Sequence, residues 1–114
     1  MPVVSLDTNL RLSDEERSAC LEALSAEAAC LLGKPESYVM VRINDGAALH
    51  FAASDAPCAY LEFKSIGLTQ AQIGAASKAL CKLLERQPGI PAERIYIEFS
   101  DIRPERFGWN GQTF

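Results

Sequence analysis

The chain has 114 residues, 48% of them hydrophobic, which is enough to bury the core of a single domain spanning residues 1–114. Its net charge of −4 argues against non-specific binding to nucleic acid or anionic membranes, because both need a basic surface. No apolar run approaches the roughly 18 residues that a membrane helix needs, so we expect no membrane insertion. The first residues also show no secretory signal.

The first half of the chain predicts a strand, a helix and a second strand. Residues 1–7 are largely apolar and lead into Asp-Thr-Asn at 7–9, which is typical of a strand entering a turn. Ser13 and Glu16 have the spacing of a capping box, which predicts the start of a helix that ends at Gly33. Residues 38–43 alternate between the two faces of a strand and lead into an Asn-Asp-Gly turn. The apolar stripe of the predicted helix consists of Cys20, Leu21, Leu24, Ala28, Leu31 and Leu32.

The second half predicts the same series. Residues 57–66 are expected to form a strand, and Thr69 with Gln72 repeats the capping-box chemistry. Gln-Pro-Gly at 87–89 ends this second helix, and residues 94–99 alternate as the last strand. Residues 106–114 form a short tail punctuated by glycine. The second helix carries a stripe of Ile73, Ala76, Leu80, Leu83 and Leu84.

The two halves superpose at a shift of 56 residues. This shift carries Ser13 onto Thr69, and it carries the helix stop, proline turn and strand at 33–41 onto 89–97. Two β-α-β units of this kind predict an α+β fold, a four-stranded mixed sheet with two helices on one face. The other face would then lack helices.

Alternation along the strands predicts which residues lie on each face of that sheet. The helix-covered side would hold Val39, Val41, Ile43, Ile95, Ile97 and Phe99. The open side would hold Tyr38, Met40, Arg42, Tyr96 and Glu98. Because this side is too apolar for ordinary solvent surface and too charged for a dry core, we expect it to face the interior of an oligomer.

The cysteines and the histidine give no metal-binding pattern. Cys20, Cys30, Cys58 and Cys81 are too widely spaced for a paired ligand motif, and His50 has no nearby partner. We therefore expect no metal site. Free cysteines of this kind favour a reducing compartment, which predicts a cytoplasmic protein.

Motifs along nearly the whole chain resemble those of the macrophage migration inhibitory factor (MIF) family within the tautomerase superfamily. The segments that carry the resemblance are Pro2 directly after Met1, Thr8-Asn9, Leu32–Pro35, Tyr38-Val39, Ser54, Pro57–Ala59, Ser65–Gly67, Arg94–Ile97, Gly108–Gly111 and Thr113-Phe114. The resemblance implies the tautomerase/MIF fold, assembled as a homotrimer around a central channel with sites between adjacent subunits. It also implies a cofactor-free keto–enol tautomerase acting on α-keto acids such as phenylpyruvate, or on dopachrome-like compounds.

Pro2 is the catalytic residue that the resemblance implies. After removal of Met1 its nitrogen becomes a secondary amine, and burial in an apolar pocket lowers the pKa of such an amine towards neutrality. A neutral amine can then abstract a proton from the carbon next to a carbonyl and return it elsewhere. From the residues alone, the simpler interpretation is that proline after Met1 is a common starting residue; the catalytic role comes from the resemblance.

The resemblance also implies contacts to the substrate from seven further residues. Lys34 would bind the substrate carboxylate, although a cation at the end of a helix also complements the helix dipole. Ile66 would present its backbone amide, and Tyr96 would reach the pocket of a neighbouring subunit. Asn110 would make a polar contact, or it simply shapes its turn. The apolar rim and mouth would come from Tyr38, Trp109 and Phe114.

Three residues depart from the family pattern. Cys58 is followed by Leu61 where many members have a second cysteine, so exchange by a dithiol is unsupported. Glu98 replaces what is often a neutral amide and would oppose anionic substrates. Phe107 is bulkier than the usual aliphatic residue and would narrow the entrance.

Two other functions stay open. Family members also act as signalling ligands that leave cells without a signal peptide and bind a cell-surface receptor. This chain would then be secreted and cytokine-like, with the pocket kept as a recognition feature. Alternatively, the trimer retains only a vestigial pocket, a reading that Glu98 and Phe107 favour.

Overall fold

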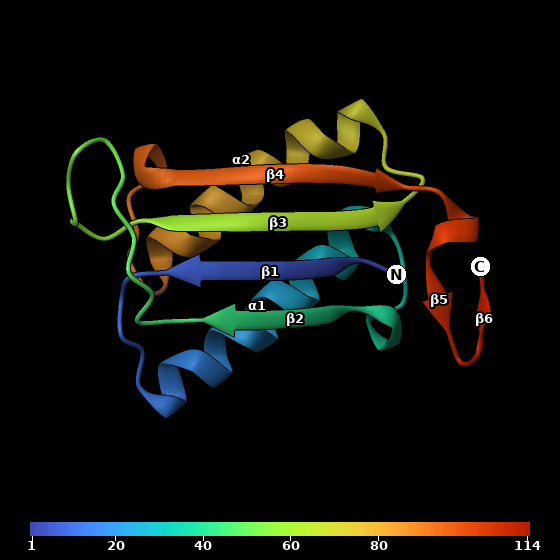
Figure 1. Ribbon diagram of the computed structural model, residues 1–114, viewed down its shortest axis with the longest axis horizontal. Helices are drawn as coiled ribbons and strands as arrows, with labels where there is room; N and C mark the ends of the chain where they lie inside the picture. The colour runs from blue at the N-terminus through green and yellow to red at the C-terminus, as the bar shows by residue number, and fades with distance from the viewer.

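A computed structural model describes residues 1–114 as two β-α-β units joined into one sheet (Figure 1). The first unit comprises β1 (Val3–Thr8), α1 (Asp14–Leu32) and β2 (Met40–Asn44), and the second comprises β3 (Ala59–Ile66), α2 (Gln70–Arg86) and β4 (Ile95–Ile102). The strand order is β2-β1-β3-β4. Pairing is parallel within each unit and antiparallel between β1 and β3, so the predicted four-stranded mixed sheet is confirmed.

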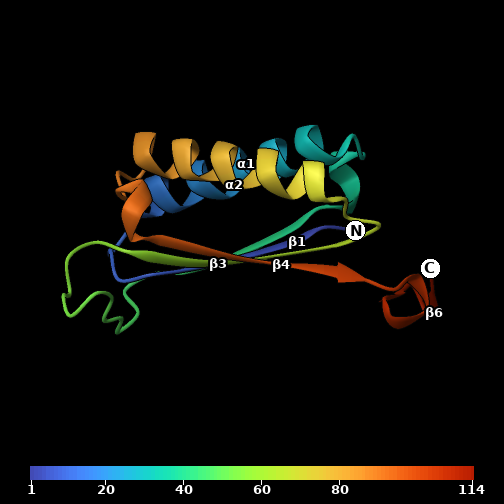
Figure 2. The ribbon, with the colours of Figure 1, turned by 90° about the horizontal axis from the view of Figure 1, so that it is seen from above.

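Both helices cover the same face of the sheet, as predicted (Figure 2). Val41, Ile97 and Phe99 pack against the core beneath them, whereas Met40 and Tyr96 are 62% and 66% exposed on the open face. Neither helix combines the length and the apolar character that a membrane span requires. The core consists of Val4, Leu6, Leu24, Leu61, Phe63, Leu80, Leu84, Ile90 and their buried neighbours.

Local chemistry repeats between the two units. Ser13 and Thr69 both form the predicted capping boxes, each accepting from the backbone of the third helical residue. Pro35 and Pro91 then adopt nearly the same backbone angles (φ −60°, ψ 135° and φ −60°, ψ 138°). Each starts a single 3₁₀ turn, η1 (Glu36–Tyr38) or η2 (Ala92–Arg94), that delivers the chain to a strand. The internal repeat is thus visible in the backbone as well as in the sequence.

The structure corrects the predicted placement of Tyr38. Tyr38 lies in η1, not on the strand, because the proline turn at Pro35 continues to this residue and β2 begins only at Met40. It therefore lies beside the end of the sheet and not on its open face. The tail, for which no regular structure was predicted, forms the 3₁₀ turn η3 (Pro104–Arg106) and the hairpin β5 (Gly108–Trp109) and β6 (Gln112–Thr113).

Candidate active site

The N-terminus and the C-terminal hairpin lie at the same end of the sheet (Figure 1). A pocket of about 240 Å³ opens there, between the N-terminus, η1 and the hairpin. Eight of its ten lining residues are hydrophobic, so it would take up the apolar part of a small molecule. The lining consists of Met1, Val3, Ser37, Tyr38, Val39, Met40, Phe107, Gly108, Trp109 and Phe114.

Four aromatic side chains form one side of this pocket, and we call them the terminal aromatic cluster: Tyr38, Phe107, Trp109 and Phe114. Trp109 meets Tyr38 edge-on and stacks on Phe114, with ring centroids 6.0 Å apart in both pairs. The Phe114 amide also donates to the Phe107 carbonyl at 3.1 Å, which ties the chain end to the hairpin. Three residues that the resemblance singled out, Tyr38, Trp109 and Phe114, are thus brought together here.

Pro2 is fully buried between two lining residues, Met1 and Val3. Its carbonyl accepts a 3.0 Å hydrogen bond from the Met40 amide, so the start of β1 is held against β2. Burial, and secondarily the charge of Lys34, lowers the pKa of the N-terminal ammonium below its ordinary value of 8.0. An amine in this corner of the fold is therefore biased towards its neutral, basic form.

Lys34 lies one residue after Gly33, whose left-handed backbone (φ 60°) closes α1. The Lys34 ammonium donates to the Ser65 hydroxyl at 3.0 Å and to the Ile66 carbonyl at 2.8 Å. The structure thus brings Lys34 and Ile66 together. Burial lowers the pKa of the N-terminal amine, and the Lys34 ammonium is close enough to lower it further. Sequence reasoning missed Ser65 as its partner; the one available signal was the position of Ser65 directly before Ile66.

Tyr96 lies away from this pocket within the chain. Strand register places Val3 opposite Lys64, and Lys64 opposite Ser100, so Tyr96 lies four residues before the row of Val3. At the rise of a β-strand, that separation is roughly 13 Å along the sheet, in addition to the width of two strand spacings. A single chain therefore cannot bring Tyr96 to the pocket beside its own Pro2.

Asn110 is also outside the pocket. It occupies the tip of the β5–β6 hairpin with φ 51°, next to Gly111 with φ 80°, and lines a separate shallow hollow on the hairpin. The left-handed backbone at both residues explains the Asn-Gly pair as turn chemistry. Phe107, in contrast, does line the pocket.

Glu98 is held on the open face of the sheet by Tyr60. The Tyr60 hydroxyl donates a 2.5 Å hydrogen bond to Glu98 Oε1. This bond, together with desolvation and nearby carboxylates, raises the pKa of Tyr60 to about 12. Tyr96 and Glu98 alternate with the buried side of β4, so both point to the open face. The chain contains no cluster of three or more His, Cys, Asp or Glu side chains that could hold a metal.

Comparison with known proteins identifies close relatives of the whole chain. The model of the family described as "Macrophage migration inhibitory factor (MIF)" matches residues 1–114. A macrophage migration inhibitory factor homolog from Brugia malayi is 41% identical, with 100% of this chain and 99% of that protein covered. The factor from Xenopus tropicalis is 37% identical at the same coverage.

Solved structures agree with this comparison. A macrophage migration inhibitory factor homologue from Prochlorococcus marinus superposes with a TM-score of 0.93 at 37% identity, covering 98% of both chains. The factor from Trichinella spiralis superposes with a TM-score of 0.90 at 35% identity, covering 98% of this chain and 99% of that one. Fold, length and sequence therefore correspond from end to end.

Proposed function

The chain belongs to the macrophage migration inhibitory factor family, and from that membership we propose that it is a cofactor-free keto–enol tautomerase. The substrates are small enolisable α-keto acids of the phenylpyruvate type or dopachrome-like compounds. The observation that carries the proposal is that Pro2 is fully buried between two residues that line an apolar pocket, where burial and the charge of Lys34 lower the pKa of the N-terminal amine. Pro2 is the catalytic residue.

The proposed reaction begins once Met1 has been removed. The Pro2 nitrogen, until then a tertiary amide, becomes a secondary amine, and the part of the pocket lined by Met1 is vacated. Burial and the nearby Lys34 charge, which lower the pKa of the present N-terminal amine, act on this nitrogen as well. A lowered pKa favours the form of the amine that carries a free electron pair.

Proton transfer then proceeds in two steps. The Pro2 amine takes a proton from the carbon next to the ketone, and the electrons of that C–H bond form the C=C bond of an enolate. The negative charge that develops on the ketone oxygen is quenched when the Pro2 ammonium returns its proton there. The product is the enol, and the amine is neutral again. Lys34 binds the substrate carboxylate through a charge-assisted hydrogen bond.

Assembly completes the proposed site. Proteins of this family form homo-oligomers, and their fold is that of a homotrimer. We place Tyr96 of one subunit at the pocket of the next, because its side chain is two-thirds exposed and distant from its own Pro2. Ile66, Asn110 and the terminal aromatic cluster supply the remaining contacts to the substrate. The exposed Met40, on the open face, is covered by the neighbouring subunits.

Kinetics of N-terminal variants test the proposal. Mass spectrometry first establishes that Met1 is absent, and the rate of phenylpyruvate tautomerisation is then compared with Pro2→Gly and with a chain carrying one alanine inserted before Pro2. The insertion keeps proline but makes its nitrogen an amide. Both changes should lower kcat/KM by about 100-fold or more.

A matched control is Glu15→Gln, an exposed change at the far start of α1, which should retain the full rate. The rate of the processed protein should rise with pH through an amine pKa below the ordinary value. Equal conversion by all four proteins would refute the role of Pro2, and no conversion by the processed protein would refute the activity.

A further inference from the structure

One arginine holds the loop between β2 and β3 against the start of β4. Residues 47–58 of this loop contain no helix or strand, only the bridge between Phe51 and Ser54. The Arg94 guanidinium donates four hydrogen bonds into the loop. The acceptors are the carbonyls of Pro57 (3.0 Å), Phe51 (3.1 Å), Ser54 (3.2 Å) and Ala56 (3.0 Å).

Arg94, the Phe51 ring and the Tyr96 ring form a chain of contacts, which we call the stack. The Arg94 guanidinium carbon lies 5.3 Å from the centroid of the Phe51 ring, and the Phe51 ring lies 4.6 Å from that of Tyr96, tilted by 46°. Arg94 is the last residue of η2, two residues before Tyr96 on β4, and the Phe51 ring lies beside both side chains. Phe51 therefore bridges them.

Phe51 is the aromatic neighbour of Tyr96 in this chain. Tyr96 is 66% exposed and comes from β4, an edge strand of the sheet, where its register partner is Tyr60 on β3. A catalytic or binding group must be held within about half an ångström of its productive position. The stack supplies such support from a loop that is itself fixed by four hydrogen bonds.

We propose that Phe51 and Arg94 are positioning residues that fix the Tyr96 ring for contact with substrate in the pocket of the adjacent subunit. The inference rests on the proposed function, in which Tyr96 completes that pocket. Arg94 acts through Phe51, and Phe51 acts through Tyr96. Neither touches the substrate.

A double-mutant cycle tests this chain of action. Phe51→Leu keeps an apolar side chain but removes the aromatic face, and it should raise KM for phenylpyruvate about tenfold in the trimer. In a Tyr96→Ala background the same change should alter KM by less than about twofold. An equal effect in both backgrounds would overturn the proposal, because Phe51 would then act independently of Tyr96.

Arg94→Lys keeps the charge but loses the planar fork that serves four carbonyls. Like Phe51→Leu, it should raise KM for phenylpyruvate. The pH profile of kcat, which is set by the Pro2 amine, should stay that of the unmodified protein. Arg86→Lys, at the exposed end of α2, is the matched control and should change neither quantity. An unchanged KM in Arg94→Lys would overturn the positioning role of Arg94.

Tyrosine ring signals in the NMR spectrum provide a readout that does not depend on activity. Phe51→Leu should move the Tyr96 ring protons towards the shifts of an unstructured tyrosine. Unchanged Tyr96 signals would overturn the stack as a support. If the protein has no tautomerase activity but Phe51→Leu still moves the Tyr96 signals, the proposed function and the catalytic purpose of the stack are refuted. The contact between Phe51 and Tyr96 itself would stand.

Discussion

The ammonium of Lys34 donates a 3.0 Å hydrogen bond to the hydroxyl of Ser65, a side chain with no solvent exposure. A second donation, to the Ile66 carbonyl at 2.8 Å, fixes the direction of the cation. Lys34 follows α1 and Ser65 belongs to β3, so the contact joins the two β-α-β units at the candidate site. The charge that would bind a substrate carboxylate is therefore positioned by the second unit.

Removal of the Ser65 hydroxyl should weaken the binding of anionic substrates. A net hydrogen bond contributes about 1 kcal/mol, so Ser65→Ala should raise KM for phenylpyruvate about fivefold while kcat stays within twofold. Steady-state kinetics at constant ionic strength measure both. In a Lys34→Met background, Ser65→Ala should have no further effect on KM; an undiminished effect there would show that Ser65 does not act through Lys34.

Neutralising Glu98 should favour anionic substrates in the proposed trimer. Glu98 shares the open face of β4 with Tyr96, so its carboxylate opposes the negative charge of a substrate in the adjacent pocket. Glu98→Gln should lower KM for phenylpyruvate about threefold at low salt, and the difference should shrink as salt screens the charges. Glu62→Gln, on the neighbouring strand opposite Glu98, is the control with a smaller effect. A salt-independent change would contradict an electrostatic cause.

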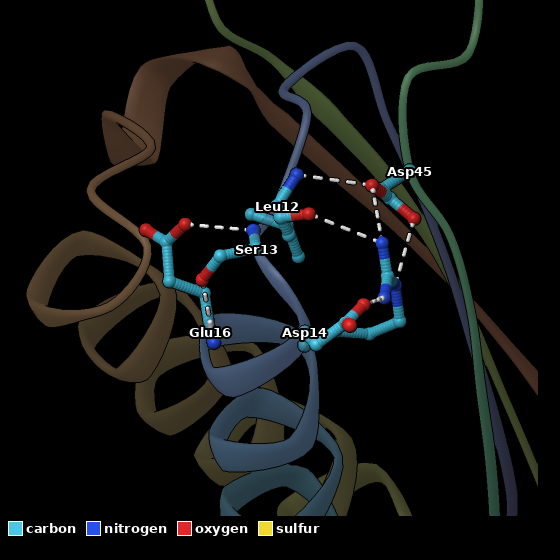
Figure 3. A network of polar contacts seen from close by, with 6 residues as sticks. Leu12, Ser13, Asp14, Glu16 and Asp45 are labelled. Carbon is cyan, nitrogen blue, oxygen red and sulfur yellow. Dashed lines mark hydrogen bonds and ion pairs between the residues drawn. The ribbon is translucent and has the colours of Figure 1, made fainter.

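Acid should weaken the attachment of α1 to the turn after β2. Asp45 accepts from Arg17 at 3.1 and 3.2 Å and from the Leu12 amide at 3.0 Å (Figure 3), and these contacts lower its pKa from 3.8 to about 2. Because the folded pKa lies below the unfolded one, the stabilisation is present above about pH 4 and disappears as pH falls towards 2.

Thermal unfolding from about pH 5 to about pH 2 checks this expectation. At about pH 5 the unmodified protein should have a higher midpoint temperature of unfolding than Asp45→Asn. At about pH 2 the two midpoint temperatures should converge. Asp14→Asn removes the fully exposed partner of Arg17 and should matter little throughout. A constant gap between the unmodified protein and Asp45→Asn would contradict the linkage.

Glycine in the loop between β2 and β3 should stabilise the fold. Ala52 and Ala53 have φ 52° and 58°, a left-handed conformation that costs an L-residue about 1–2 kcal/mol. Ala52→Gly and Ala53→Gly remove this cost but add the backbone entropy of glycine, so each should raise the free energy of unfolding by about 0.5 kcal/mol. Denaturant titration measures it. Ala47→Gly, at a position without positive φ, should not stabilise.

Much of the fold follows from patterns within a few residues of each other. The capping boxes at Ser13 and Thr69 require only a partner three residues away, and alternation of apolar side chains identifies the covered face of β4. Tyr38 was misplaced because the proline turn at Pro35 competes with strand alternation at the same residues. The hairpin at 108–113 has strands of only two residues, too short to produce an alternating pattern.

The sequence by itself determined the helix ends, the apolar faces and the internal repeat, and its motifs indicated the family. Only the tertiary structure decided that Lys34 contacts Ser65, that Phe51 links Arg94 to Tyr96, and that Tyr96 lies far from Pro2 in its own chain. Helix caps and strand alternation depend on neighbours along the chain. Contacts between residues 31 to 45 positions apart depend instead on strand register and loop packing, which local patterns do not encode.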